Sequence, residues 1–187
     1  MVRSPLLVNC CEGAMASSEN AETVFYPKLA ETIDSWNFVF PNDANPYGSM
    51  FGGKLLAIMD TTAAIAAIRY AGRTVSTAAV EAVEFVHPVV VGDRLKTSAK
   101  VVHVGRTSMM VRVDVYVDHG GNVFERCTHA HFAMVAFDDR RNTTPVPPLK
   151  IATAEDQAAF DLAASIRANA LARAKQAKQS VATPKTE

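Results

Sequence analysis

The stretch that decides the fold runs from Gly52 to Gly72 and reads GGKLLAIMDTTAAIAAIRYAG. It is rich in Ala, Leu, Ile and Met, which favour helix, and it ends in a glycine of the kind that commonly stops one. The pattern predicts a single helix over residues 54–71 that follows the Gly52-Gly53 pair. Since its side chains are apolar nearly all round, we expect a buried helix rather than a surface one.

Working outward from this helix, the pattern changes to alternating β-branched and polar residues. The alternation predicts one strand before the helix and four after it, over residues 36–40, 75–85, 94–104, 108–117 and 123–137. A loop dense in turn formers spans residues 41–48, and short turns separate the last four strands. Short turns join antiparallel neighbours, so the sequence predicts an α+β layer of one helix on one antiparallel sheet.

The composition excludes several classes of protein. The 187 residues are 49% hydrophobic, which is typical of a globular chain with one domain and extensions. Nineteen Lys and Arg balance nineteen Asp and Glu, so no basic excess points to nucleic acid or to a membrane surface. No apolar run reaches the roughly 18 residues that a membrane-spanning helix needs.

The two ends of the chain differ from its centre. We expect residues 1–22 to form a flexible arm in which Met15 is a second possible start, and residues 23–150 to form the folded domain. A helical extension is predicted over 151–187, opened by a Thr153-x-x-Asp156 capping box and ending in a disordered tail from residue 180. Its apolar positions Ala159, Leu162, Ile166 and Ala170 suit docking on the core or on another subunit, or the helix is free and frayed.

Cysteine usage indicates a reducing compartment. The three cysteines are Cys10, Cys11 and Cys127, an odd number with two adjacent, which is no disulfide framework. The N-terminal apolar stretch is too short for a secretory signal. We therefore expect a cytoplasmic protein.

Chemistry is indicated at the start and the middle of the helix. Its first N–H groups have no acceptors within the helix and carry partial positive charge, which suits an oxyanion that develops from a carbonyl. The Gly52-Gly53 pair either admits a substrate to this backbone or only allows close packing. Asp60 is a carboxylate in an otherwise apolar helix, and is either a paired structural residue or a general base or nucleophile.

The spacing of these features points to two chains. Gly53 and Asp60 share a helix face but lie seven residues, about 10 Å, apart along the axis. A nucleophile must come within about 3 Å of the carbonyl that the amides hold. Two antiparallel helices from two copies could place Gly53 of one near Asp60 of the other, which predicts a site shared across a two-fold dimer. Asn45 would then orient a water or the carbonyl, or it is merely a turn residue.

Several motifs occur in one order along the chain. They are Asn-x-x-Gly-x-x-Phe-Gly-Gly-x-Leu-Leu-x-x-Met-Asp at 45–60, Ala-Gly at 71–72, Val-Gly-Asp at 91–93, Gly-Arg-Thr-Ser-Met at 105–109 and Val-Ala-Phe-Asp at 135–138. In these motifs the chain resembles the acyl-CoA hydrolases of the hotdog-fold thioesterase superfamily, of the cytosolic type, over residues 30–150. The resemblance implies a hotdog fold, in which a five- to six-stranded antiparallel sheet wraps a long helix. It also implies a homodimer, often assembled into a trimer of dimers.

The resemblance implies roles residue by residue. Asp60 matches the catalytic acid, Asn45 the catalytic Asn that the other subunit contributes, and Gly53 the amide that polarises the thioester carbonyl. The turn formed by Gly105, Arg106, Thr107 and Ser108 matches one that meets the nucleotide and pantetheine of CoA. One departure is Tyr70, which replaces a commonly seen His, and the segments before 30 and after 150 match no motif.

Other candidate residues have two interpretations each. His129 and His131 share a strand face but lack the third ligand that zinc needs, so we expect a polar strand face and no metal. Cys127 is expected to be a small buried residue rather than a nucleophile. His87 resembles the His of hotdog dehydratases without their other signature residues. Arg106 is either a phosphate ligand or a solvated turn residue, and Lys54 is expected to be exposed and is a candidate contact of the CoA phosphates.

The expected function is hydrolysis of a fatty acyl-CoA to a free fatty acid and CoA. No cofactor is required, since CoA is part of the substrate, and neither nucleic acid nor membrane is an expected partner. One alternative is a hotdog module that binds acyl-CoA as a sensor or scaffold without catalysis. The other is a dehydratase, which would add water to an enoyl-CoA.

Overall fold

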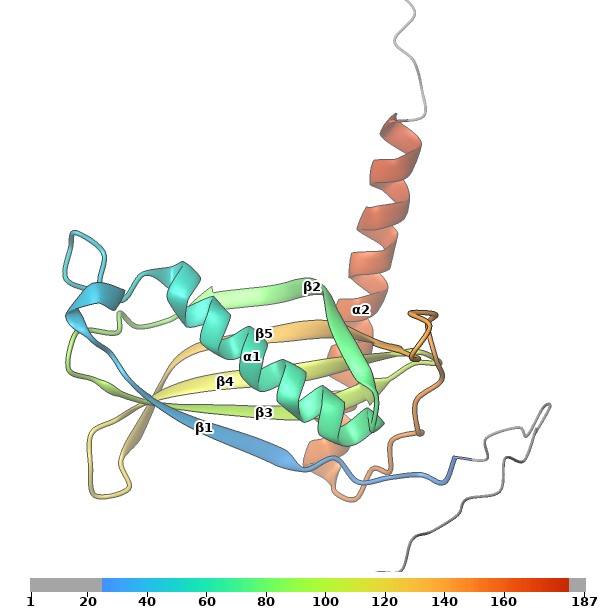
Figure 1. Cartoon of the computed structure of the whole chain (residues 1–187), viewed down its shortest axis with the longest axis horizontal. Helices are drawn as coiled ribbons and strands as arrows, with labels where there is room; N and C mark the ends of the chain where they lie inside the picture. Colours follow the sequence, from blue (N-terminus) through green and yellow to red (C-terminus); the bar gives the residue numbers. More distant parts are fainter. Residues whose placement is uncertain (1–24, 182–187) are drawn as a thin grey trace, which may run out of the picture.

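A computed structural model describes residues 25–181 as one five-stranded antiparallel sheet with a helix on each face (Figure 1). The sheet order is β1-β3-β4-β5-β2. The elements in chain order are β1 (Thr32–Phe38), the short 3₁₀ helix η1 (Pro41–Asp43), α1 (Gly52–Ala71), β2 (Thr74–Phe85), β3 (Arg94–Val104), β4 (Ser108–Asp118), β5 (Phe124–Phe137) and α2 (Ala154–Val181). This is the hotdog arrangement, with five strands. The expected arm 1–22, the second start at Met15 and nearly all of the tail 180–187 lie outside the described residues.

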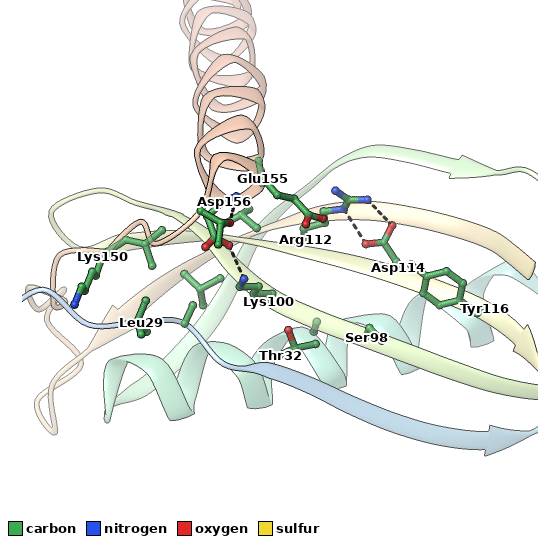
Figure 2. Close-up of a pocket in the computed structure, with 17 residues that line it drawn as sticks. Leu29, Thr32, Ser98, Lys100, Arg112, Asp114, Tyr116, Lys150, Glu155 and Asp156 are labelled. Atoms are coloured by element: carbon green, nitrogen blue, oxygen red, sulfur yellow. Dashed lines mark hydrogen bonds and ion pairs between the residues drawn. The ribbon is translucent and has the colours of Figure 1, made fainter. Parts of the chain in front are cut away.

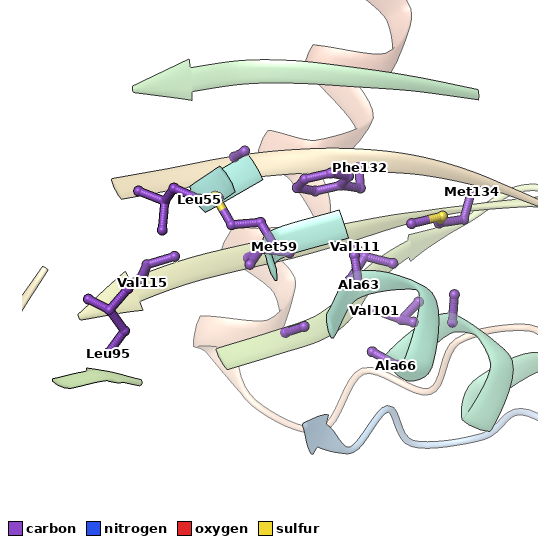
Figure 3. Close-up of a cluster of buried hydrophobic side chains, with 14 of the residues drawn as sticks. Leu55, Met59, Ala63, Ala66, Leu95, Val101, Val111, Val115, Phe132 and Met134 are labelled. Carbon is purple, nitrogen blue, oxygen red and sulfur yellow. The ribbon is translucent and has the colours of Figure 1, made fainter. Parts of the chain in front are cut away.

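The core lies between α1 and the inner face of the sheet (Figure 3). Met59 of α1 is fully buried, and the sheet contributes Val111, Phe132 and Leu95. These strand residues alternate with polar ones because successive side chains point to opposite faces of a sheet. The inner face is therefore apolar and the outer face carries most of the charged side chains.

The opposite side of α1 corrects the expectation of a helix buried all round. Ile65 is 43% and Ile68 is 44% exposed in the single chain. They lie on the helix side that faces away from the sheet, which leaves an apolar surface without a partner in one chain. The helix ends as expected at Gly72, which adopts a left-handed conformation with φ 64° and donates its N–H to the carbonyl of Ile68.

Three boundaries differ by two residues or more from the pattern-based expectation. The helix α1 was expected to follow the Gly52-Gly53 pair but includes it, because helical backbone begins directly after Phe51. The first strand was expected over 36–40 but spans Thr32–Phe38, because pairing with β3 runs from Thr32 opposite Lys100 to Phe38 opposite Arg94. The apolar run at its end then leaves the sheet and enters η1 at Pro41. The four later strands lie within about one residue of their expected ranges.

The helix α2 docks on the outer face of the sheet, opposite α1 (Figure 1). It begins where the capping signal placed it, with the backbone N–H of Asp156 donating to Thr153 Oγ1 at 3.0 Å. The docking contact centres on Ala163, which is fully buried against Val102 and Met110. Two of the expected positions, Ala159 and Ile166, pack against the same cluster, whereas the expected Leu162 is 50% exposed. A small side chain at the contact lets the helix backbone approach the sheet closely. The C-terminal half of α2 extends beyond the sheet.

Candidate functional site

The loop before α1 is organised by Asn45. Its Oδ1 accepts the backbone N–H groups of Tyr47 at 2.9 Å and Ser49 at 3.3 Å, and its Nδ2 donates to Ser49 Oγ at 2.9 Å. A side-chain amide that satisfies successive N–H groups of its own loop is an Asx-type turn. Its amide oxygen therefore shapes the loop, and a second Nδ2 hydrogen is left for another acceptor.

The start of α1 offers unpaired amides. Phe51 provides no side-chain cap, and the first backbone hydrogen bond of the helix is donated by the N–H of Lys54 to the carbonyl of Phe51 at 2.9 Å. Among the described residues, nothing accepts the N–H groups of Gly52 and Gly53. The Phe51 ring lies against Gly53, so that a side chain there would collide with it. Gly53 thus keeps a helix-start N–H that is open to an external acceptor, as its expected role requires.

Asp60 lies on α1 where the helix faces β2. Its Oδ1 accepts a hydrogen bond from the hydroxyl of Thr77 on β2 at 2.6 Å, and within residues 25–181 no ion pair neutralises it. The carboxylate is half-buried. A carboxylate that is positioned by one neutral donor and lacks a cation keeps its capacity to accept a proton or to attack.

Thr77 is a residue that the sequence analysis did not identify. Its hydroxyl also approaches Met134 Sδ at 3.4 Å, but the shorter contact to Asp60 takes its one proton. A threonine in a β-branched strand gives no local signal of function. The only sequence clue is a hydroxyl on the strand that directly follows the helix.

One chain does not bring the three predicted catalytic residues together. Gly53 and Asp60 are separated by nearly two turns of α1, and within the described chain no hydrogen bond links Asp60 to Asn45 or Gly53. The spacing along a rigid helix fixes this separation at about 10 Å. A single protomer therefore presents the predicted catalytic groups at two separate positions of α1, the helix start and Asp60.

The predicted CoA turn is present between β3 and β4. The N–H of Gly105 donates to the carbonyl of Ser108 at 2.7 Å, the Thr107 carbonyl accepts from Ala136, and the side chain of Arg106 is exposed. The turn has an added neighbour, since Arg167 of α2 donates to Ser108 Oγ at 2.9 Å.

Lys54 also lies where the sequence placed it, beside the glycine pair and exposed. Its Nζ forms an ion pair with Asp43 Oδ1 at 3.3 Å. A CoA phosphate would therefore compete with this carboxylate for the ammonium group.

The remaining candidate residues differ in their burial. Cys127 is fully buried, burial raises the pKa of its thiol, and Sγ donates to the Val115 carbonyl. His131 is 3% exposed and burial is the main cause that lowers its pKa to about 4, so it is neutral at neutral pH. His87 lies exposed just after β2. Over residues 25–181 no group of three or more His, Cys, Asp or Glu is arranged to hold a metal ion.

Tyr70, the departure from the family motif, ties α1 to the segment after β5. Its hydroxyl donates to the Pro147 carbonyl at 3.1 Å, and burial raises the pKa of Tyr70 to about 12. Tyr70 lies at the end of α1 far from the glycine pair. The replacement of the usual His by Tyr70 therefore does not alter the helix start.

A hollow of about 490 Å³ lies on the outer face, between the start of α2 and strands β1, β3 and β4 (Figure 2). Four of its charged side chains form two ion pairs: Lys100 with Asp156 at 2.6 Å, and Arg112 with Asp114 at 2.8 Å. The bond from Arg112 to Asp114 raises the pKa of the guanidinium, and the ammonium of Lys100 lowers the pKa of Asp156. The hollow contains none of the predicted site residues.

Gly53 and Asp60 lie on the helix that packs beside a free sheet edge. The strand β2 is an edge strand with no neighbour on its outer side, and several large apolar side chains are exposed near it. They include Ile65 and Ile68 of α1, Val80 and Phe85 of β2, and Phe51 at the start of α1. An apolar surface of this kind beside an unpaired edge marks an interaction site. Within the described chain no helix is long and apolar enough to cross a membrane.

Comparisons with known proteins bear on this geometry. Residues 47–124 match the Thioesterase superfamily. An uncharacterised acyl-CoA thioester hydrolase from Zymomonas mobilis is 38% identical over 111 residues, which are 58% of this chain and 74% of the relative. The acyl-CoA thioester hydrolase YciA of Salmonella typhimurium is 36% identical over 111 residues, which are 57% of this chain and 84% of the relative.

Solved structures agree with the sequence relatives. The acyl-CoA hydrolase from Staphylococcus aureus, in complex with butyryl coenzyme A, coenzyme A and coenzyme A disulfide, superposes with a TM-score of 0.75 at 32% identity, covering 80% of this chain and 92% of that one. A hexameric acyl-CoA thioesterase without ligand superposes with a TM-score of 0.74 at 34% identity, covering 80% of this chain and 96% of that one.

Three variants of the Staphylococcus aureus hydrolase have also been solved. In them an Asn, an Asp and a Thr are each replaced by Ala, and the three residues are separated by 15 and then 17 positions. Asn45, Asp60 and Thr77 have the same two spacings here.

Proposed function

The chain belongs to the acyl-CoA thioester hydrolases of the thioesterase superfamily, and from this premise we propose that it hydrolyses fatty acyl-CoA at a site shared between two copies. The observation that carries the proposal is the division of the site along α1. Gly53 offers an open N–H at the helix start, while Asp60 lies nearly two turns further on, beside a free sheet edge. An antiparallel α1 from a second copy would bring Gly53 of one chain opposite Asp60 of the other.

The proposed chemistry uses these groups in turn. The Gly53 N–H donates to the thioester carbonyl oxygen and stabilises the negative charge that develops there. Asp60 either takes a proton from the attacking water or attacks the carbonyl carbon itself. The new bond joins oxygen to the acyl carbon, the C–S bond breaks, and the thiolate leaves as CoA once protonated. On the second route the acyl group is left on Asp60 as a mixed anhydride, which a water molecule then hydrolyses to the free acid and the Asp60 carboxylate. Asn45 of the chain that supplies Gly53 holds the water or the carbonyl with its free amide hydrogen.

The assembly follows from the same surface. We propose that β2 edges of two copies meet and that the exposed side of α1 packs against its counterpart, which would cover Ile65 and Ile68. Hexameric relatives support a further assembly into a trimer of dimers.

A panel of acyl-CoA thioesters tests the proposed substrate. Purified protein is mixed with acyl-CoAs from acetyl-CoA to palmitoyl-CoA, and released thiol is recorded with a chromogenic disulfide. We expect turnover with fatty acyl chains. Tight binding without thiol release would instead support a sensor or scaffold, and loss of an enoyl-CoA double bond would support a dehydratase.

Thr77 is expected to position Asp60 for the reaction. Thr77→Val keeps the shape of the side chain but removes the hydrogen bond to the carboxylate, a bond to a charged group whose loss we expect to lower kcat about 10-fold. KM should stay near its wild-type value, because in this proposal Thr77 acts through Asp60 and not on the substrate. Thr77→Ser restores the donor and should recover most of kcat. Full activity of the Val variant, or no recovery with Ser, would remove Thr77 from the site.

A further inference from the structure

The helix α2 reaches the turn of residues 105–108, which the family resemblance assigns to CoA. Its residue Ala163 packs on Val102 and Met110, which lie within three residues of the end of β3 and the start of β4 that the turn joins. One turn of helix further on, Arg167 projects from α2 to the turn itself. A segment without any motif of the family therefore supplies a side chain beside the expected CoA contacts.

Arg167 is held close against the turn. Its Nη2 donates to Ser108 Oγ at 2.9 Å, and both terminal nitrogens lie about 3.2 Å from where a Cβ on Gly105 would stand. Any larger residue at 105 would push the guanidinium away. Gly105 therefore leaves the space that the guanidinium of Arg167 occupies.

The charge of Arg167 has no counterpart. No carboxylate among residues 25–181 forms an ion pair with it, whereas Arg173 on the same helix is paired with Glu81. Arg106 in the turn is exposed and equally lacks an acidic partner in the described part of the chain. One turn therefore carries Arg106 in its own backbone and binds Arg167 through Ser108, and neither guanidinium has an ion-pair partner among residues 25–181.

The wall next to Arg167 contributes no opposing charge. His103 stacks on Phe160 of α2 with ring centroids 4.6 Å apart. Burial is the main cause that lowers the pKa of His103, and the charge of Arg167 adds to it, so the imidazole is neutral at neutral pH. A guanidinium that is partly buried between neutral groups is well suited to bind a phosphate, because little water screens it.

We propose that Arg167 binds a phosphate group of the CoA moiety together with Arg106, so that α2 is part of the substrate site. The inference rests on the proposed function, since it takes the substrate to be a CoA thioester. It gives the C-terminal helix a role in recognition of the nucleotide half of the substrate, away from the reacting thioester.

The test separates the charge of Arg167 from its hydrogen bond. Arg167→Gln removes the charge but can still donate to Ser108, and Arg173→Gln is the matched control on the same helix. Both are compared with wild type on an acyl-CoA and on the acyl-pantetheine with the same acyl chain, which lacks every phosphate. We expect Arg167→Gln to raise KM for acyl-CoA by about 10-fold or more, with KM for acyl-pantetheine and kcat unchanged. Arg173→Gln should change neither substrate's KM.

An unchanged KM for acyl-CoA would overturn the proposal. An equal rise of KM for acyl-CoA and acyl-pantetheine would also overturn it, because Arg167 would then only stabilise the structure of the turn. Titration calorimetry with CoA itself keeps the test independent of turnover. If wild type hydrolyses no thioester but binds CoA, the proposed function fails, and weaker CoA binding by Arg167→Gln still supports the inference. A wild type that neither hydrolyses a thioester nor binds CoA overturns both.

Discussion

Asp60→Asn is expected to lower kcat for acyl-CoA hydrolysis by about 10³-fold, with little change in KM. The substitution keeps the size of the side chain, and its amide oxygen can still accept the hydrogen bond from Thr77. What is lost is the negative charge that takes the proton of water or attacks the thioester. General-base catalysis alone contributes about 10²–10⁴-fold, and loss of a nucleophile costs at least as much.

Thiol release under saturating acyl-CoA measures this effect directly. Asp139→Asn is the matched control, because Asp139 is exposed on the segment after β5 and should leave kcat unchanged. Thermal unfolding of both variants should stay close to wild type, since neither loses a buried contact. If Asp60→Asn retains more than about a tenth of wild-type kcat, Asp60 neither activates water nor attacks the carbonyl.

The sequence predicted those parts of the fold that depend on local periodicity. Gly72 adopts the left-handed conformation that only a glycine takes readily, so the end of α1 could be placed to the residue. The strands β3, β4 and β5 follow one another through short turns, which makes their antiparallel order predictable.

Features set by tertiary pairing were less accessible. The start of β1 depends on its register with β3, and the choice of Ala163 over Leu162 depends on how closely α2 approaches the sheet. Neither the strand register nor the distance of the helix from the sheet can be read from the residues of the element itself.

The candidate site shows the same division. Asp60 stands out because it is a charged residue among the apolar residues of its helix. The glycine pair stands out because glycines disfavour helix yet occur at a helix start. Thr77 and Arg167 are ordinary residues for the strand and the helix in which they occur, so nothing in the neighbouring sequence marks them. They acquire a role only because the fold brings β2 to α1, and α2 to the turn after β3.

The division of the site between two copies leads to a complementation result. Asn45→Ala and Asp60→Asn should each be nearly inactive as homodimers, since every site then lacks one group. When the two variants are co-expressed in equal amounts, random pairing makes half of the dimers mixed. In a mixed dimer one site lacks both groups and the other is intact, so we expect about a quarter of wild-type activity.

A second co-expression serves as the control, because a shared site and a private site again predict different activities. Wild type is paired with the double variant Asn45→Ala, Asp60→Asn. If the site is shared, both sites of a mixed dimer lack one group, and only the wild-type homodimers, about a quarter of the dimers, are active. If each chain carried a whole site, mixed dimers would keep one intact site, and activity would rise to about half. In that case the two single variants would not rescue one another at all. A shared site therefore predicts about a quarter of wild-type activity in both co-expressions, whereas a site within one chain predicts none in the first and about half in the second. These expectations hold whether the dimers stand alone or assemble into trimers of dimers.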